Sequence, residues 1–285
     1  MGKIKNQVIE DSYSKKDSTE QELSILLGLD SFAYIVVDSN KRQPQLMRNF
    51  ELGSISSISK IIAQIQQIIQ EDKPLNLAYK RIRIAYTGST TTLIPQRLFN
   101  PDEKEQYLSQ LTEMDSTYEV RSDHLLPIDA QNVYAMEEEL FSFMRLSYPG
   151  TLILHLNTVI YSQIAAIAKT IVEPFIFVNV RSRNLNIFYF DKGVLVFMNS
   201  FEFQASKDFI YYVMLVFNQF NLNSQIVPLY LSGEIVKESE IYQLLHRYIK
   251  FTHFLSNEQL PLVGPKLSAA SAYQYFDLIA LGNMK

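Results

Sequence analysis

The chain has 285 residues with a formal net charge of −4, and its 47% hydrophobic and 20% charged content suits one large or two medium globular domains. It contains no cysteine, which excludes disulfides and thiolate metal sites, and its charge balance predicts no basic face for nucleic acid. Because no apolar run approaches a membrane span and the N-terminus lacks the apolar core of a signal peptide, we expect a cytoplasmic protein without membrane insertion.

The first elements are a polar arm and a triplet of strands. Residues 1–22 are charged and polar, so we expect an arm that is loose or lies along the surface. Three apolar runs follow within residues 23–52, separated by polar turns at 28–31 and 38–41. Aromatic and β-branched residues suit strands, and short turns join sequential strands as antiparallel neighbours. This stretch therefore predicts three sequential strands.

A helix with an isoleucine stripe follows the triplet. The spacing predicts a helix over residues 54–71, in which six isoleucines fall on one face: Ile58, Ile61, Ile62, Ile65, Ile68 and Ile69. Because isoleucine is not a strong helix former, burial of this stripe must hold the helix. Residues 81–86 alternate as a strand, and residues 87–136 hold elements that we interpret as an insertion. A short helix, a strand and a helix follow at 137–146, 151–156 and 157–171.

The second half repeats this order. Residues 174–203 again hold three apolar runs, with polar turns at 181–184 and 191–193, and predict an antiparallel meander. The helix at 206–220 is apolar on nearly all sides, so we expect it between layers. The remaining predicted elements are a strand, a helix, a strand and a helix, at 226–231, 235–248, 249–255 and 268–281.

Residues 23–173 and residues 174–285 can therefore be written as the same series of elements. Each reads as three strands, helix, strand, helix, strand and helix, which indicates internal duplication. The predicted fold class is α/β, with two related domains that each contain a mixed five-stranded sheet flanked by helices.

Five segments carry a resemblance that spans nearly the whole chain. They are LSILLGLDSFAYIV at 23–36, TLIPQRLF at 92–99, NVYAMEEEL at 132–140, LILHLNTVIYSQI at 152–164 and YFDLIALG at 275–282. No single segment is specific, but they occur in the expected order. The sequence resembles the superfamily of actin, sugar kinases and heat-shock chaperones, whose domains are ribonuclease H-like. More narrowly, it is similar to a bacterial family of unknown function, mainly from Bacteroidetes, with this actin-like ATPase fold.

This resemblance implies a nucleotide site between two lobes. In active members, the first turn of each strand triplet supplies an Asp for the hydrated magnesium ion and a glycine followed by Thr or Ser for the phosphates. Glycine lets backbone amides approach phosphate closely. In the first turn here, Gly28 and Asp30 match the start of this pattern, but Ser31 stands where the glycine pair should follow.

The other two segments of the implied site are also altered. Asn179 stands about where the second Asp is expected, and Arg181 and Ser182 follow it without a glycine. Ser232 and Gly233 retain one glycine of a late pair that packs against adenine and ribose, and an acid follows them. The candidate cofactor-binding residues in the cleft are thus Gly28, Asp30, Ser31, Asn179, Arg181, Ser182, Ser232 and Gly233.

Simpler interpretations stay open for several of these residues. Arg181 and Arg183 could bind an anion, but turn arginines at the sheet edge are the favoured interpretation. Asp30 is more often a hairpin-turn residue than a metal-positioning one. The four histidines lack metal-like spacing, and His155 lies in an apolar strand as an expected hydrogen-bonded core residue. The sequence therefore predicts no catalytic residue and no metal ligand.

We expect a binding or assembly module that has lost nucleotide turnover and has a protein partner that the sequence does not identify. We expect no cofactor, with ATP and Mg²⁺ as the alternative. An ATP-binding switch with weak hydrolysis is the competing hypothesis, and a small-molecule kinase-like enzyme is a remoter one.

Overall fold

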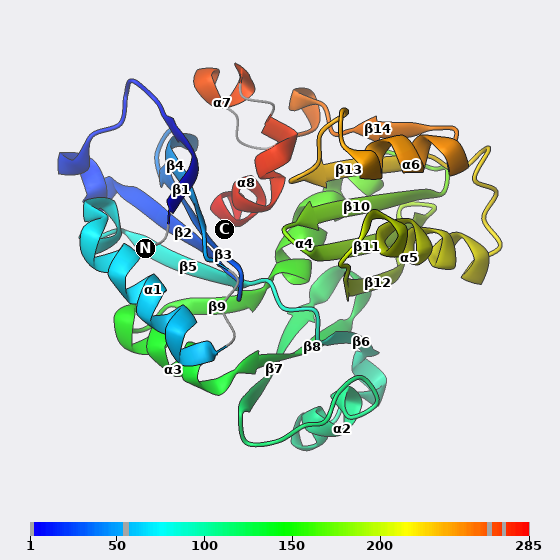
Figure 1. Ribbon diagram of the computed structural model, residues 1–285, viewed down its shortest axis with the longest axis horizontal. Coiled ribbons are helices and arrows are strands. Elements are labelled where there is room, and N and C mark those ends of the chain that lie inside the picture. Colours follow the sequence, from blue (N-terminus) through cyan, green and yellow to red (C-terminus); the bar gives the residue numbers. More distant parts are fainter. Residues whose placement is uncertain (1–2, 54–56, 261–263, 270–271, 285) are drawn as a thin grey trace.

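Two mixed sheets dominate the computed structural model, which describes residues 3–53, 57–260, 264–269 and 272–284 (Figure 1). The first sheet has the order β1 (Lys3–Ile9), β4 (Gln43–Glu51), β3 (Ser31–Asp38), β2 (Gln21–Leu27), β5 (Arg81–Tyr86) and β9 (Leu152–His155). The second has the order β12 (Val194–Glu202), β11 (Asn184–Asp191), β10 (Phe175–Arg181), β13 (Leu229–Gly233) and β14 (Thr252–Phe254). We call the elements around these sheets the first and second lobes. The predicted α/β class is confirmed.

The two sheets share strand order and direction. In the first, β2, β3 and β4 are antiparallel neighbours, while β5 is parallel to β2 and β9 to β5. In the second, β10, β11 and β12 are antiparallel, and β13 and β14 continue in parallel. Even the register shifts agree, since one lies between Val36 and Val37 of β3 and the other between Tyr189 and Phe190 of β11. The five strands of the second sheet therefore correspond in order and direction to β4, β3, β2, β5 and β9 of the first.

The first sheet departs from the expected five strands at its edge. Residues 3–9, expected in a loose or surface arm, form β1 and pair antiparallel with β4. This pairing satisfies backbone groups that the β4 edge would otherwise expose. Gln21 and Glu22, assigned to the same arm, begin β2 and are buried. Residues 1–2 of the arm lie outside the described part of the chain.

Four helices cover the outer faces of the sheets. Helices α1 (Ile58–Glu71) and α3 (Glu138–Ser147) pack on the first sheet, and α5 (Ser206–Gln219) and α6 (Glu240–Tyr248) pack on the second. The isoleucine stripe of α1 buries Ile61, Ile65 and Ile68, so the stripe faces the core of the first lobe as predicted. Residues 54–56, included in the predicted helix, are not among the described residues.

The layer between the lobes differs from the prediction. Helix α5 lies on an outer face, where Tyr211 is 62% exposed and Leu215 is 40% exposed, so the expectation of a helix buried between layers was wrong for it. The buried helices are α4 (Leu156–Ala168) and α8 (Phe276–Asn283), which lie between the two sheets in Figure 1. Their shared apolar core joins the lobes.

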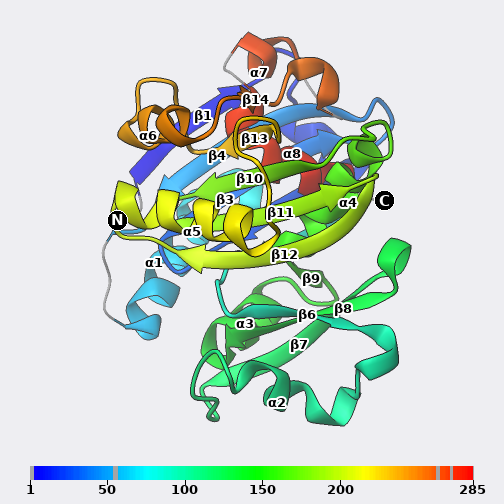
Figure 2. The same cartoon turned by 90° about the vertical axis from the view of Figure 1, so that its right-hand side faces the viewer.

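A small third sheet extends from the first lobe. It has the order β6 (Thr91–Pro95), β8 (Ala130–Glu137) and β7 (Tyr118–Leu125), and the short helix α2 (Lys104–Leu108) packs on it. Figure 2 shows this inserted sheet beside the β12 edge of the second lobe. The short helix α7 (Pro265–Ala269), which precedes α8, contacts β1. Within the described part of the chain, no helix is both long and apolar enough to span a bilayer.

Candidate functional site

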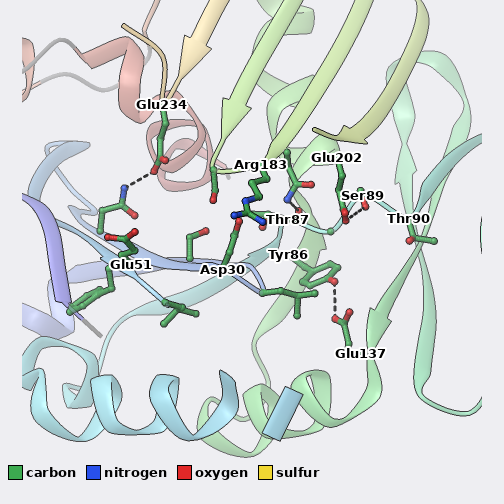
Figure 3. A pocket seen from close by; sticks show the side chains of 18 of the residues that line it. Asp30, Glu51, Tyr86, Thr87, Ser89, Thr90, Glu137, Arg183, Glu202 and Glu234 are labelled. Atoms are coloured by element: carbon green, nitrogen blue, oxygen red, sulfur yellow. Dashed lines mark hydrogen bonds between the residues drawn. The ribbon is translucent and has the colours of Figure 1, made fainter. Parts of the chain in front are cut away.

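A cleft of about 740 Å³ opens where the two lobes and the inserted sheet meet (Figure 3). Its walls are the turn after β2, the end of β4, the segment after β5, the turn after β10, and the ends of β8, β12 and β13. The strand triplets place their first turns on opposite sides of this space, as the resemblance implied. It is therefore the place where the predicted site residues can be compared with the structure.

The first turn contributes Asp30 and Ser31 to the cleft wall. The backbone N–H of Gly28 donates to the carbonyl of Ser31 at 2.9 Å and closes the turn. A Cβ at Gly28 would lie 2.5 Å from the hydroxyl oxygen of Thr87, so glycine permits close packing here. Ser31 is only 6% exposed, and its hydroxyl has no hydrogen-bond partner among the described residues.

The second turn is dominated by a buried arginine. Arg181 ends β10 and is 2% exposed. Its Nη1 donates to Asp277 Oδ2 of α8 at 2.8 Å, and its Nη2 donates to Asn49 Oδ1 of β4 at 3.1 Å. The favoured interpretation of a turn arginine was therefore wrong for Arg181, because an ion pair takes it into the interior. Arg183 does lie in the turn, is exposed, and lines the cleft together with Ser182.

Further contacts extend this connection between the lobes. Asn49 Nδ2 donates to Glu234 Oε1 at 3.1 Å, and Lys5 Nζ lies 2.9 Å from Glu234 Oε2. Burial opposes ionisation of Glu234, but Arg181 and Lys5 outweigh it and hold the pKa of that carboxyl below its ordinary value. We call Asp277, Arg181, Asn49, Glu234 and Lys5 the inter-lobe clamp.

The clamp was largely missed from the sequence. Asn49 and Lys5 sit in strands with no motif around them, so nothing marked them as partners of the second lobe. One signal was present: Asp277 stands alone in the apolar run of α8, and a buried carboxylate needs a partner.

The remaining predicted residues lie beneath the cleft wall. Gly233 has a φ of +86°, and a Cβ there would lie 2.0 Å from the carbonyl oxygen of Val180, so the contact between β10 and β13 demands glycine. Asn179 and Ser232 are cross-strand neighbours and fully buried. The side-chain polar atoms of both have no hydrogen-bond partner among the described residues.

The far end of the cleft joins three parts of the chain. Tyr86, which ends β5, donates its hydroxyl to Glu137 Oε2 at 2.8 Å, and Ser89 donates to Glu202 Oε1 of β12 at 2.7 Å. Figure 3 shows Glu137 and Glu202 at this end and Glu51 and Glu234 at the other. Burial raises the pKa of Glu137, and the nearby charge of Glu202 acts in the same direction.

His155 fixes the loop at this end from below. Its Nε2 lies 2.9 Å from the carbonyl oxygen of Gly88, and the backbone N–H of Asn157 donates to its Nδ1 at 3.1 Å. A neutral ring with its proton on Nε2 satisfies both contacts. Burial lowers the pKa of His155 to about 4, which agrees with the neutral form. The expectation of a hydrogen-bonded core histidine is confirmed.

The charges in the cleft wall are unequal. The carboxylates outnumber the cations, because Lys5 and Arg183 face Asp30, Glu51, Glu137, Glu202 and Glu234. The described residues include no cluster of three or more ligating side chains that could hold a metal ion. The cleft is therefore an acidic space without a dedicated metal site in the described part of the chain.

Comparisons with known proteins identify a family and a fold. A sequence profile for the family described as "Protein of unknown function (DUF3822)" matches residues 10–251. A crystal structure from Bacteroides thetaiotaomicron, described as a protein with actin-like ATPase fold and unknown function, superposes with a TM-score of 0.82 at 20% identity, over 96% of this chain and 99% of that chain. The two lobes therefore have the actin-like ATPase fold that the resemblance implied.

A more distant structure is described as the "PilM-PilN type IV pilus biogenesis complex". It matches with a TM-score of 0.57 at 12% identity, over 93% of this chain and 97% of that chain. No match to this sequence was found among curated proteins. At these identities the structural likenesses establish the fold alone.

Proposed function

The chain belongs to the DUF3822 family of proteins of unknown function, and we propose that it is a non-catalytic actin-like module that binds or assembles with a protein partner. The observation that carries this proposal is the inter-lobe clamp. Arg181 is the last residue of β10 and corresponds in register to Gly28, which follows β2, and its side chain hydrogen-bonds both lobes. A nucleotide would require small residues and accessible backbone amides at this place.

The charge of the cleft also argues against ATP with Mg²⁺. A triphosphate needs positive groups or a metal ion around it, whereas five carboxylates and two cations line this cleft. Glu234 lies in the segment that should pack against the nucleoside and carries a carboxylate whose pKa is held low. The residues present do not fit the cofactor, and we assign no reaction step to it.

The equal order of strands in the two sheets supports an origin by internal duplication. The inter-lobe clamp would then be a later alteration of a nucleotide site, which makes that site degenerate. The fold likeness to a protein of a pilus assembly complex supports a binding role, although it identifies no partner for this chain. The absence of cysteine supports a reducing, cytoplasmic location.

The competing proposal is an ATP-binding switch with weak hydrolysis. It is favoured by Asp30, Ser31 and Ser182, which line the cleft as the resemblance implied. In such a switch, closure of the lobes around nucleotide would change the affinity for a partner. An enzyme that phosphorylates a small molecule is a remoter proposal for the same cleft.

Thermal unfolding with and without ATP and Mg²⁺ separates these proposals. We expect the same melting temperature in both, because a ligand stabilises a protein only by binding its native state. A rise of several degrees that Asp30→Ala abolishes would instead establish the switch. The partner is sought by affinity capture from the native host, followed by a binding measurement with the purified captured protein.

A further inference from the structure

We propose that the chain pairs with a second copy of itself through the outer face of α5, with the two α5 helices antiparallel. Figure 2 shows α5 in front of the second sheet. No residue of α5, all of which is described, lines the cleft. The inference therefore concerns a separate surface and does not depend on what the cleft binds.

The first observation is the composition of the exposed side of α5. Exposed residues recur every four positions along this side of the helix, at Lys207, Tyr211, Leu215 and Gln219. We call these four residues the α5 stripe. Its centre is apolar, because Tyr211 and Leu215 are among the exposed large hydrophobic residues of the chain. A helix that is apolar on nearly all sides is usually covered by another layer, and α5 lacks one on this side.

The corresponding helix of the first lobe differs in this respect. Helix α1 also follows a strand triplet and packs on the outer face of its sheet. Its exposed side carries no large apolar residue and consists of Ser59, Lys60, Ala63, Gln66, Gln70 and Glu71. The apolar outer side is therefore a property of α5 and not of the fold that the two lobes share.

The ring of Tyr211 is positioned by neighbouring aromatic residues. Its centroid lies 5.4 Å from that of Tyr212 in an edge arrangement, and Tyr212 stacks on Phe201 of β12 at 4.6 Å. A ring held by such contacts loses little side-chain entropy on binding, and tyrosine is enriched at the centres of interfaces. The centre of the α5 stripe is thus a preformed apolar contact surface.

The charges at the two ends of α5 indicate which partner covers it. Lys207 lies in the first helical turn, where the helix dipole disfavours a cation. It has no ion-pair partner among the described residues, and Asp208 beside it accepts from the backbone N–H groups of Gln204 and Ala205.

The last turn of α5 has the opposite deficiency. It contains no basic residue, so no cation of its own helix neutralises the negative carbonyl end. An antiparallel second copy corrects both deficiencies, because it places Lys207 of each chain beside the last turn of the other. This charge complementarity favours a second copy over an unrelated apolar partner.

The spacing of the α5 stripe is self-complementary in the same arrangement. With the twofold axis level with Val213, Tyr211 of one chain meets Leu215 of the second copy, and Lys207 meets Gln219. Residues four positions apart form the ridges that pack into the grooves of a facing helix. Because the same surface is used by both chains, the assembly closes as a dimer.

Sedimentation velocity of the full chain over a series of micromolar concentrations tests the proposal. We expect a species with twice the mass of the chain that dissociates on dilution. Leu215→Glu should weaken dimerisation by about a hundredfold, because it buries a carboxylate from each chain without a partner. Lys207→Gln should weaken it by about threefold, which is the size of a charge effect at a helix end.

Leu146→Glu is the matched control, because Leu146 is an exposed helical leucine of α3 in the first lobe. Unchanged dimerisation in this variant, with loss in Leu215→Glu, supports the proposal, whereas equal loss in both variants overturns it. A monomer at every concentration also overturns it. So does a monomer that binds phosphatidylglycerol vesicles and loses that binding in Leu215→Glu, since the face would then contact a membrane.

Cross-linking tests the orientation of the pair, because the chain contains no cysteine of its own. A mixture of Lys207→Cys and Gln219→Cys chains, treated with a short bis-maleimide, should form cross-linked pairs. Lys207→Cys chains alone should not, since their cysteines lie at opposite ends of the helix pair. Efficient cross-linking of Lys207→Cys chains with one another would overturn the antiparallel arrangement.

Discussion

The turn after β2 and the turn after β10 occupy the same place in two sheets of the same design, yet they do different things. Leu27 pairs with Phe32 before the first turn, and Val180 pairs with Leu185 before the second. The next residue is Gly28 in one lobe and Arg181 in the other. The first turn is closed by its own backbone, while the second sends a cation into the interior to bind both lobes.

The strands beside these turns show the same contrast. Thr87 follows β5 and donates its N–H to Leu27, and Glu234 follows β13 and donates its N–H to Val180. The backbone contact is shared, but only Glu234 joins the inter-lobe clamp. The backbone arrangement that both sheets share therefore determines where the cleft lies. The side chains at the edge of the cleft determine whether the two lobes bind a ligand there or contact each other.

The largest effect should come from the buried arginines of the two lobes. Arg181→Met leaves Asp277 buried without a cation, which should lower the free energy of unfolding by about 3–5 kcal/mol. Arg83→Met in the first lobe should cost less, about 1–3 kcal/mol, because Arg42 still contacts Glu22. Denaturant unfolding measures the free energy of unfolding of both variants.

A double variant sharpens this comparison. Arg181→Met combined with Asp277→Leu removes both charges, so it should recover much of the lost stability. Equal costs for Arg181→Met and Arg83→Met would mean that the clamp is no more important than an ion pair within one lobe.

The next effect concerns the glycines near the turns. Gly233→Ala should cost about 1–3 kcal/mol, because the residue has a φ of +86° and the new Cβ would meet the carbonyl of Val180. Gly28→Ala should cost less than about 1 kcal/mol, since the side chain of Thr87 can rotate away. Thermal unfolding compares the stabilities of the two variants. A larger loss of stability for Gly28→Ala than for Gly233→Ala would contradict the conclusion that Gly233 is the more constrained glycine.

The smallest effect is a difference in pH dependence between the two ends of the cleft. The pKa of Glu234 is held low, so its stabilisation is present above its unfolded pKa, about 4.3, and is lost as pH falls through the folded value. The pKa of Glu137 is raised by burial, so its charge costs stability above the folded pKa, and that cost disappears as pH falls.

Glu234→Gln should therefore destabilise the protein most at neutral pH, and Glu137→Gln should stabilise it most at neutral pH. Both differences from the wild type should shrink toward pH 3. Unfolding free energies measured across this range check the signs, and the same sign for both variants would refute the electrostatic contrast between the two ends.

The sequence predicts the order of strands and helices in each lobe better than the contacts between distant segments. Short apolar runs with polar turns predict the triplets 23–52 and 174–203, because alternation and turn chemistry are local. Strand β1 escaped prediction because its pairing with β4 is nonlocal and nearly all of its side chains are exposed, so no buried face marks it. The clamp escaped for a similar reason, since Arg181 and Asn49 are 132 positions apart. Only Asp277, the single charged residue of an apolar helix, indicated that a buried partner must exist.

A crystal structure grown with saturating ATP and Mg²⁺ tests the central claim most directly. We predict that Arg181 keeps its contacts with Asp277 and Asn49 and that no nucleotide lies between the lobes. Nucleotide seated between the two turns, with Arg181 released from Asp277, would contradict the account.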